Sequence, residues 1–350
     1  MRIEDAAAEF EPAGVYLGTA TYGLPPRAAT AAVQAHERQR AQGRMDPIDA
    51  DVAIARSRAS FARLVGVDPS SVAVASQVSQ LVGLVASALP DGASVLVADG
   101  DFTSVLFPFA AQGPRLALRS VPLEALPDQV ERRTDVVAVS LVQSANGRLV
   151  DLDALVEACA AAGARLVIDA TQAVGWLPVL AGKVDLLVCG GYKWLLGPRG
   201  TCFLAGRDDA LAELCPQAAG WFAGDDPWTS IYGLPLRLAE DAQRFDVSPA
   251  WGCWVGQAPA LELLEAVGIE QVQTHDVALA NRFRSGLGLA PGDSAIVSSE
   301  VPAGTEERLA AAGVVTSVRA GRLRCSFHLY NTDADVDAAL AAIGPGLGSP

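Results

Sequence analysis

The strongest constraint on the fold is an alternation of short apolar runs with helical segments between about residues 50 and 207. The helical segments are expected at 51–65, 77–89, 104–112 and 151–162. The strands are expected at 72–75, 94–98, 135–142, 165–168, 184–189 and 201–205. Short apolar strands that alternate with helices require crossover connections, so the pattern predicts an α/β fold with a mostly parallel central sheet covered on both faces.

The pattern changes after about residue 215. Residues 215–255 are rich in aromatic residues and proline and include four tryptophans, which could line a site, form a subunit interface or fill the core. Helices are expected over 256–267 and 276–286, with a weaker α+β tail that contains a strand at 322–329. The segment 290–305 shows no clear period. A large α/β domain followed by a small C-terminal domain is therefore expected.

Composition excludes several classes of protein. The chain has 26 basic and 40 acidic residues, a net charge of −14, which argues against nucleic acid as the main partner. A hydrophobic content of 51% excludes a disordered chain, and the apolar stretches are too short to cross a membrane. Six scattered cysteines without a CxxC pair, and only three histidines, predict no metal site. Reduced thiols and an acidic N-terminus without an apolar run favour a cytoplasmic protein.

Two expected strands end in residues that carry chemistry. The strand 165–168 runs into Asp169, and the strand 184–189 runs into Gly-Gly-Tyr and then Lys193, one of only two lysines in the chain. Ligands of open α/β sheets bind at such carboxyl ends. Asp169 could instead cap a helix, Lys193 could be a solvated loop residue, and the glycines could form ordinary turns. The two residues together favour a binding site over separate structural roles.

The sequences around this pair resemble a known family. The cofactor-binding core of class V aminotransferases resembles two stretches of this chain, VIDATQAVGWLPV and CGGYKWLLGPRGTCFLAG. The lysine of the second stretch comes 24 residues after the aspartate of the first. The similarity extends to YLGTATYGLPPRA, DFTSVLFPF, SANGRLVDL and RLRCSFHLYNTDADVD. These are fold-type I pyridoxal 5′-phosphate enzymes, a group that includes cysteine desulfurases, kynureninases and isopenicillin-epimerase-like proteins. The resemblance implies a segment 1–20 that packs with the small domain, a large cofactor-binding domain 21–250 and a small domain 251–350.

The resemblance assigns roles around the cofactor ring. Lys193 would hold the cofactor as a Schiff base and then move the Cα proton as general base and acid. Asp169 would keep the pyridine nitrogen protonated. Gln172 would donate a hydrogen bond to the 3-oxygen of the ring, and Phe102 would stack on its face.

A second group of residues would bind the cofactor phosphate. The segment Ser76-Gln77-Val78 opens an expected helix, whose free amides and dipole suit an anion. An ordinary serine N-cap is the alternative interpretation. Tyr192 resembles the tyrosine of the kynureninase Tyr-Lys pair, which contacts the phosphate. Ser248 would add a phosphate contact from a neighbouring subunit of the homodimer that the family implies.

Substrate recognition is assigned to the C-terminal strand. Arg324 of the Arg-x-Ser pattern would bind the amino acid carboxylate, with Arg322 as the competing residue. Tyr22 would contact the substrate as well. Ser144 would contact the cofactor, although cysteine desulfurases have asparagine there. Arg199 could face the mouth of the site or only cover its turn, and the turn is favoured.

The resemblance leaves the reaction open, because the cofactor supports several outcomes. Transamination of an amino acid is ranked first, a lyase that cleaves at Cβ or Cγ second, and epimerisation third. Cysteine desulfurases use a mobile cysteine about thirty residues before the carboxylate-binding arginine, and residues 286–318 contain none. A non-catalytic α/β protein is the remaining alternative; no GxGxxG or GxxxxGKS loop supports it.

Overall fold

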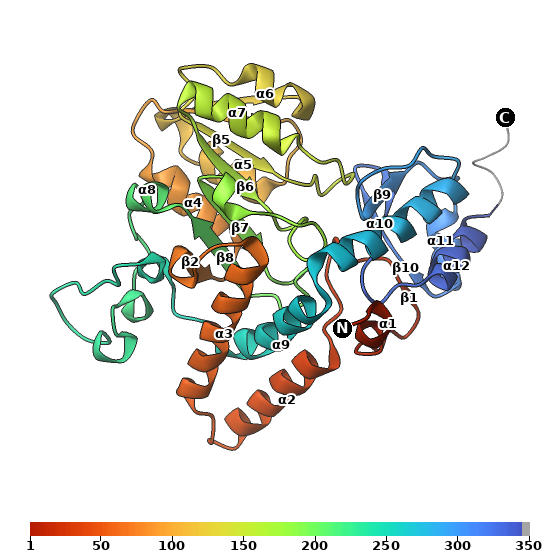
Figure 1. Cartoon of the computed structure of the whole chain (residues 1–350), viewed down its shortest axis with the longest axis horizontal. Coiled ribbons are helices and arrows are strands. Elements are labelled where there is room, and N and C mark those ends of the chain that lie inside the picture. Colours follow the sequence, from red (N-terminus) through yellow and green to blue (C-terminus); the bar gives the residue numbers. More distant parts are fainter. Residues whose placement is uncertain (345–350) are drawn as a thin grey trace.

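A computed structural model describes residues 1–344 and places a seven-stranded sheet at the centre of the molecule (Figure 1). Its strands, in the order β2-β8-β7-β6-β5-β3-β4, are parallel except for β8, which is antiparallel to both neighbours. Their bounds are β2 Val72–Ala75, β3 Ser94–Ala98, β4 Ala117–Val121, β5 Val136–Ser140, β6 Arg165–Asp169, β7 Leu186–Gly190 and β8 Cys202–Gly206. The predicted α/β class with a mostly parallel sheet is confirmed.

Helices cover both faces of this sheet, as the continuous apolar strands predict. In β3, Val95 and Val97 contribute to one buried cluster, whereas Leu96 and Ala98 contribute to the cluster on the other face. The helices of this unit are α2 Arg27–Ala41, α3 Pro47–Val65, α4 Val78–Ala88, α5 Thr103–Ala110, α6 Leu126–Gln129, α7 Leu152–Ala162, α8 Asp208–Ala212 and α9 Trp251–Val267. The expected helices of the α/β region lie within one or two residues of these bounds, except that α3 starts four residues earlier. Helices α2, α6 and α8 and strand β4 were not anticipated.

A smaller unit follows α9. Its antiparallel sheet has the order β11-β12-β9. The elements are α10 Ile269–Gly286, β9 Ile296–Ser299, α11 Thr305–Ala311, β10 Val314–Val315, β11 Ser317–Arg319, β12 Arg322–Ser326 and α12 Asp333–Ile343. The segment without clear period therefore contains strand β9, which is too short to show one.

The N-terminal segment lies against this smaller unit. It contains α1 (Ile3–Ala7) and β1 (Val15–Tyr16), and β1 pairs in parallel with β10. Helix α9, which begins at the expected domain boundary, packs along α2 and α3 of the larger unit (Figure 1). The domain limits at residues 20 and 250 stay predictions.

The aromatic segment divides between core and surface. Trp254 is fully buried, so it fills the core. Trp221 packs against Trp228 and Trp251 with ring centroids 5.2 and 6.4 Å away. The indole nitrogens of Trp228 and Trp251 donate to the Asp51 carboxylate on α3 at 3.0 and 3.1 Å. Within residues 1–344 none of these four tryptophans lines the main cavity described below.

No helix of the described chain is long and apolar enough to cross a membrane.

Candidate functional site

A cavity of about 340 Å³ opens at the carboxyl ends of the parallel strands, the edge at which ligands of such sheets bind. Residues that follow β2, β3, β5, β6 and β7 converge there. The lining consists of Ser76, Gln77, Val78, Ser79, Phe102, Thr103, Ser104, Ser140, Ser144, Asp169, Thr171, Gln172, Gly190, Tyr192, Lys193, Arg199, Gly200 and Thr201. Nine of the sequence-predicted residues are therefore brought together: Lys193, Asp169, Gln172, Phe102, Ser76, Gln77, Val78, Tyr192 and Ser144.

Lys193 lies in the turn after β7 with its amine inside the cavity. The residue is only 5% exposed, and Nζ lies 5.2 Å from the centroid of the Phe102 ring. Burial lowers the pKa of Lys193 to about 8, while the nearby Asp169 carboxylate counteracts this shift. About a tenth of the amine is therefore uncharged at pH 7, far more than for an ordinary lysine, and this form can act as a nucleophile or base.

Asp169 ends β6 and faces the same cavity. One of its oxygens, Oδ1, accepts a hydrogen bond of 2.9 Å from the backbone N–H of Thr171. Burial raises the pKa of Asp169, whereas the Thr171 contacts and the Lys193 charge oppose that shift. The ionised form of a buried carboxylate of this kind is stabilised by a cationic partner inside the cavity.

Gln172 is held by protein groups on both ends of its amide. Its Oε1 accepts 2.8 Å from the indole nitrogen of Trp194, and its Nε2 donates to Ala20 O at 2.9 Å and to Ser144 Oγ at 3.0 Å. Both amide hydrogens are thus in use. Donation to a cofactor oxygen, the role that the resemblance implies, requires the hydrogen bond to Ser144 to be exchanged.

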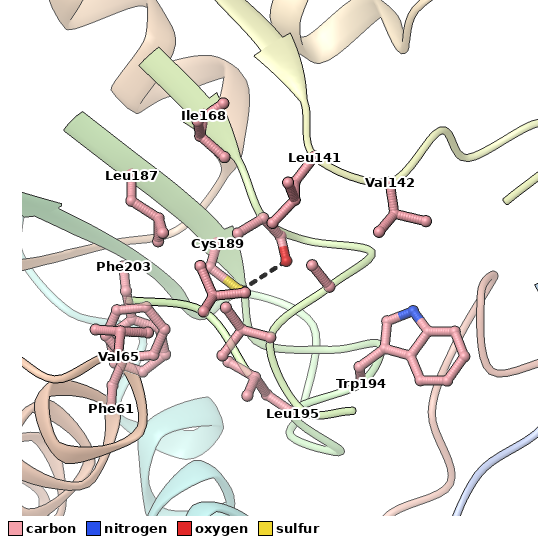
Figure 2. Close-up of a cluster of buried hydrophobic side chains, with 14 of the residues drawn as sticks. Phe61, Val65, Leu141, Val142, Ile168, Leu187, Cys189, Trp194, Leu195 and Phe203 are labelled. Carbon is pink, nitrogen blue, oxygen red and sulfur yellow. Dashed lines mark hydrogen bonds between the residues drawn. The ribbon is translucent and has the colours of Figure 1, made fainter. Parts of the chain in front are cut away.

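The turn that carries Lys193 is packed against two glycines. A Cβ at Gly23 would lie 1.9 Å from Lys193 O, and one at Gly175 would lie 2.2 Å from Trp194 O. Leu196 has a positive φ of 59°, which is uncommon for a side chain of this kind. Figure 2 shows Leu195 of this turn and Cys189 of β7 within a buried hydrophobic cluster. The backbone that positions Lys193 therefore has little freedom to move.

The part of the cavity lining at the start of α4 suits an anion. Helix α4 begins at Val78 with Gln77 at its N-cap position, and no side chain caps its first amides. The alternative of an ordinary serine N-cap at Ser76 is therefore wrong. The unbonded amides and the helix dipole can bind a phosphate at this position.

Arg199 also reaches the cavity, although the sequence favoured a role in the turn alone. Its guanidinium carbon lies 5.1 Å from the centroid of the Tyr192 ring. Its backbone N–H donates to the Tyr22 hydroxyl at 3.2 Å. The turn brings this cation to the lining of the cavity, a position that the GPRG sequence does not specify.

Three sequence-predicted residues, Tyr22, Ser248 and Arg324, do not line the main cavity in the described chain. Tyr22 borders a neighbouring cleft between α2 and the 197–198 turn, with its ring 5.7 Å from that of Tyr192. Ser248 accepts a hydrogen bond of 3.3 Å from the Trp221 indole, next to the surface tryptophans.

Arg324, on β12, lies directly behind Ser144. Its Nη1 donates to the backbone and side-chain oxygens of Ser144, its Nη2 donates to Thr21 Oγ1 at 2.7 Å, and its Nε donates to Ser317 Oγ at 3.1 Å. Burial lowers its pKa to about 10. Arg322, the competing candidate, instead pairs with the exposed Glu300 at 2.7 Å.

Sequence reasoning missed several polar groups that support these residues. Thr171 Oγ1 accepts from the Gly190 backbone at 3.0 Å, which ties β6 to β7. Asp101 accepts from the backbone of Phe102 at 2.6 Å and of Ser140 at 2.8 Å. Thr171 and Asp101 lie close to Asp169 and Phe102 in the quoted motifs, and this proximity was the sequence signal that could have identified them. Within residues 1–344, no three His, Cys, Asp or Glu side chains are grouped to hold a metal.

The residues of the cavity fit pyridoxal 5′-phosphate. A buried amine can bond the aldehyde, a buried carboxylate can meet the pyridinium, and uncapped helix amides can bind the phosphate. The exposed face of Phe102 opens on the cavity, so a ring can stack there. Fold and site together define a fold-type I enzyme of this cofactor.

Comparisons with known proteins agree with this class. The model of the aminotransferase class-V family matches residues 16–303, so the chain belongs to that family. An uncharacterized aminotransferase of Bacillus subtilis, YcbU, is 28% identical over 82% of each chain. Isopenicillin N epimerase of Streptomyces clavuligerus is 27% identical over 95% of each chain.

Solved structures share the fold. A cysteine desulfurase of Thermococcus onnurineus superposes with a TM-score of 0.85 at 21% identity over 98% of each chain. The cystine C-S lyase C-DES superposes with a TM-score of 0.84 at 21% identity, over 95% of this chain and 98% of that one. The predicted fold, the enzyme class and the cofactor are confirmed, and the non-catalytic alternative is wrong.

Proposed function

We propose that the chain is an aminotransferase of amino acids in which Lys193 is the catalytic base. The observation that supports this most directly is the buried Lys193 amine, with its pKa lowered to about 8, in one cavity with Asp169 and beside Phe102. Bound pyridoxal 5′-phosphate supplies an electron-withdrawing ring that stabilises negative charge at the substrate Cα.

The residues of the chain divide the remaining work. Lys193 would hold the cofactor through Nζ, and the same amine would take the proton from the substrate Cα as a base and then pass it on to the cofactor as an acid. Asp169 keeps the proton on the pyridine nitrogen, and Phe102 packs against the ring. The first amides of α4, together with Ser76 and Tyr192, bind the phosphate.

Arg324 is the substrate-carboxylate ligand in this proposal. The residue is only 1% exposed, and its guanidinium donates two hydrogen bonds to Ser144. A carboxylate must therefore replace the Ser144 contacts, so the substrate would lie beside Ser144 in the cavity that Lys193 also lines. Bidentate geometry would then orient the substrate Cα relative to Lys193.

A lyase reaction is the second candidate. Within residues 1–344 none of the six cysteines lines the cavity, so no thiol is in place for sulfur transfer through a persulfide. Elimination at Cβ needs no thiol, and C-DES, which has the same fold, is named a cystine C-S lyase. Epimerisation, the activity named for the Streptomyces relative, is third. We further propose a cytoplasmic homodimer in which Ser248 reaches the partner's phosphate.

The test is a comparison of Lys193→Ala with Lys183→Ala. Lys183 is the only other lysine, and it forms an exposed ion pair with Asp153 at 2.8 Å. With added pyridoxal 5′-phosphate, Lys183→Ala should keep the near-visible absorption band of lysine-bound cofactor, and Lys193→Ala should lose it. A keto product that forms from an amino donor only when a keto acid is present supports transamination. An eliminated fragment without any acceptor would show a lyase instead.

A further inference from the structure

A fully buried pair of side chains, Asp276 and His328, lies behind the turn that carries Lys193. Both residues are 0% exposed, and neither lines the cavity. His328 Nδ1 lies 3.0 Å from Asp276 Oδ2, and His328 Nε2 lies 3.1 Å from the backbone oxygen of Trp194. The pair therefore contacts the peptide group between Trp194 and Leu195, one residue beyond Lys193.

The chemistry of the partners fixes the direction of these hydrogen bonds. A carbonyl oxygen can only accept, so His328 Nε2 must carry a hydrogen. One further proton is shared between Nδ1 and the Asp276 carboxyl, because a bare ring nitrogen facing an ionised carboxylate would be repelled. The pair is then neutral as a unit, which suits its burial, and Nε2 donates to Trp194 O.

Trp194 is held from its other side as well. Its indole nitrogen donates to Gln172 Oε1 at 2.8 Å, and its carbonyl lies so close to Gly175 that a Cβ there would be 2.2 Å away. The His328 and Trp194 rings pack with centroids 5.3 Å apart. The residue next to Lys193 is thus fixed by both its backbone and its side chain.

The pair also connects this turn to the carboxylate-binding strand. Asp276 lies on α10, and His328 follows β12, four residues after Arg324. One short segment of chain therefore positions Arg324 against Ser144 and His328 against Trp194. The positions of Arg324 and of the turn that carries Lys193 therefore both depend on how this segment packs.

We propose that Asp276 and His328 are positioning residues that hold Lys193 in its reactive place through the Trp194 carbonyl. This inference rests on the role of Lys193 in the proposed function. His328 supplies the hydrogen bond, and Asp276 fixes the ring orientation that keeps Nε2 directed at the carbonyl. Loss of the hydrogen bond releases the turn and exposes the Lys193 amine.

The test measures the reactivity of Lys193 in the cofactor-free full chain. Trinitrobenzenesulfonate labels uncharged amines, and peptide mapping by mass spectrometry separates Lys193 from Lys183, the exposed internal reference. His328→Gln and His328→Asn form a matched pair. The glutamine nitrogen can take the place of Nε2 and reach Trp194 O, whereas the asparagine nitrogen takes the place of Nδ1 and reaches only Asp276.

The expected result is a difference between these two variants. Relative to Lys183, labelling of Lys193 should rise at least tenfold in His328→Asn and stay within threefold of the wild type in His328→Gln. Asp276→Asn, which can still donate to Nδ1, should behave like His328→Gln, and Asp276→Leu like His328→Asn.

Leu309→Ala controls for general loosening of the small unit. Leu309 is buried in that unit's core and lies outside the Lys193 turn. Its loss should lower the thermal midpoint without raising Lys193 labelling. Equal labelling in His328→Gln and His328→Asn, or an equal rise in Leu309→Ala, would overturn the proposal. Persistence of the absorption band in Lys193→Ala would instead contradict the proposed function and leave the labelling result intact.

Discussion

The amide oxygen of Gln172 accepts a hydrogen bond of 2.8 Å from the indole nitrogen of Trp194. This contact joins the segment after Asp169 to the residue after Lys193, so the two motifs that identify the site are bonded directly. Both groups are buried, and the Gln172 backbone oxygen accepts in addition from the Trp176 indole at 2.7 Å. The spacing of aspartate and lysine is therefore maintained by a polar contact below the cavity.

Trp194→Phe should test this contact. Phenylalanine keeps most of the ring but leaves Gln172 Oε1 buried without its donor, which costs about 1–3 kcal/mol of unfolding free energy. Urea unfolding of the cofactor-free protein measures the change. Trp228→Phe, which removes an indole donor from the partly exposed Asp51, is the control and should cost less than about 1 kcal/mol. Equal losses of unfolding free energy in the two variants would show that the buried hydrogen bond contributes no more to stability than the exposed one.

The burial of Lys193 predicts a pH-dependent stability in the cofactor-free protein. Its pKa is about 8 in the folded state and 10.5 in the unfolded reference, so the folded state binds fewer protons between these values. Stability therefore rises with pH across that window, and below pH 8 the buried amine costs roughly 3 kcal/mol. Lys193→Met removes this cost.

The measurement is the unfolding free energy of Lys193→Met minus that of the wild type, at pH 7 and near pH 10. The variant should be the more stable protein at pH 7, and its advantage should shrink toward pH 10. Lys183→Met, at an exposed ion pair, should show a difference of no more than about 1 kcal/mol at either pH. A constant advantage of Lys193→Met at both values would contradict the pKa shift.

The sequence predicts the large unit better than the small one for physical reasons. Buried parallel strands such as β3 and β5 are continuous apolar runs, so their bounds can be read closely. Strand β9 has four residues and β10 two, and such short strands derive their stability from partners distant in the chain. Helix α2 has few buried residues, so its sequence has too few apolar positions for a helical period to be recognised.

The same distinction holds for the site. Asp169 ends β6 and Lys193 follows β7, so their positions could be predicted from the strands themselves. His328 and Asp276 come from the small unit and reach Trp194 only through tertiary packing. No spacing in the sequence predicts that contact. Arg199 likewise enters the cavity through the shape of its turn, which the four letters GPRG leave open.

Gly23→Ala should disrupt the Lys193 turn through a clash with backbone. The new methyl group would lie 1.9 Å from Lys193 O, and no side-chain rotation can relieve a contact with a carbonyl. We expect a loss of about 1–3 kcal/mol in the free energy of unfolding and weaker binding of pyridoxal 5′-phosphate. An absorbance titration with the cofactor measures the binding. Gly83→Ala in α4 is the control, because nothing lies within 4 Å of its Cβ. It should stabilise the helix by about 0.5–1 kcal/mol and leave cofactor binding unchanged.

Arg324→Lys should weaken substrate binding far more than Arg322→Lys does. A lysine at 324 cannot make the several planar hydrogen bonds of the guanidinium, and a lost charged hydrogen bond is worth about 1.5–3 kcal/mol. KM for the amino donor should therefore rise about tenfold to a hundredfold, with the absorption band of bound cofactor unchanged. Arg322→Lys affects only an ion pair with the exposed Glu300, so its KM should stay within about twofold of the wild type. If Arg322→Lys raises KM and Arg324→Lys does not, the carboxylate lies at the outer arginine, and the assignment of Arg324 is wrong.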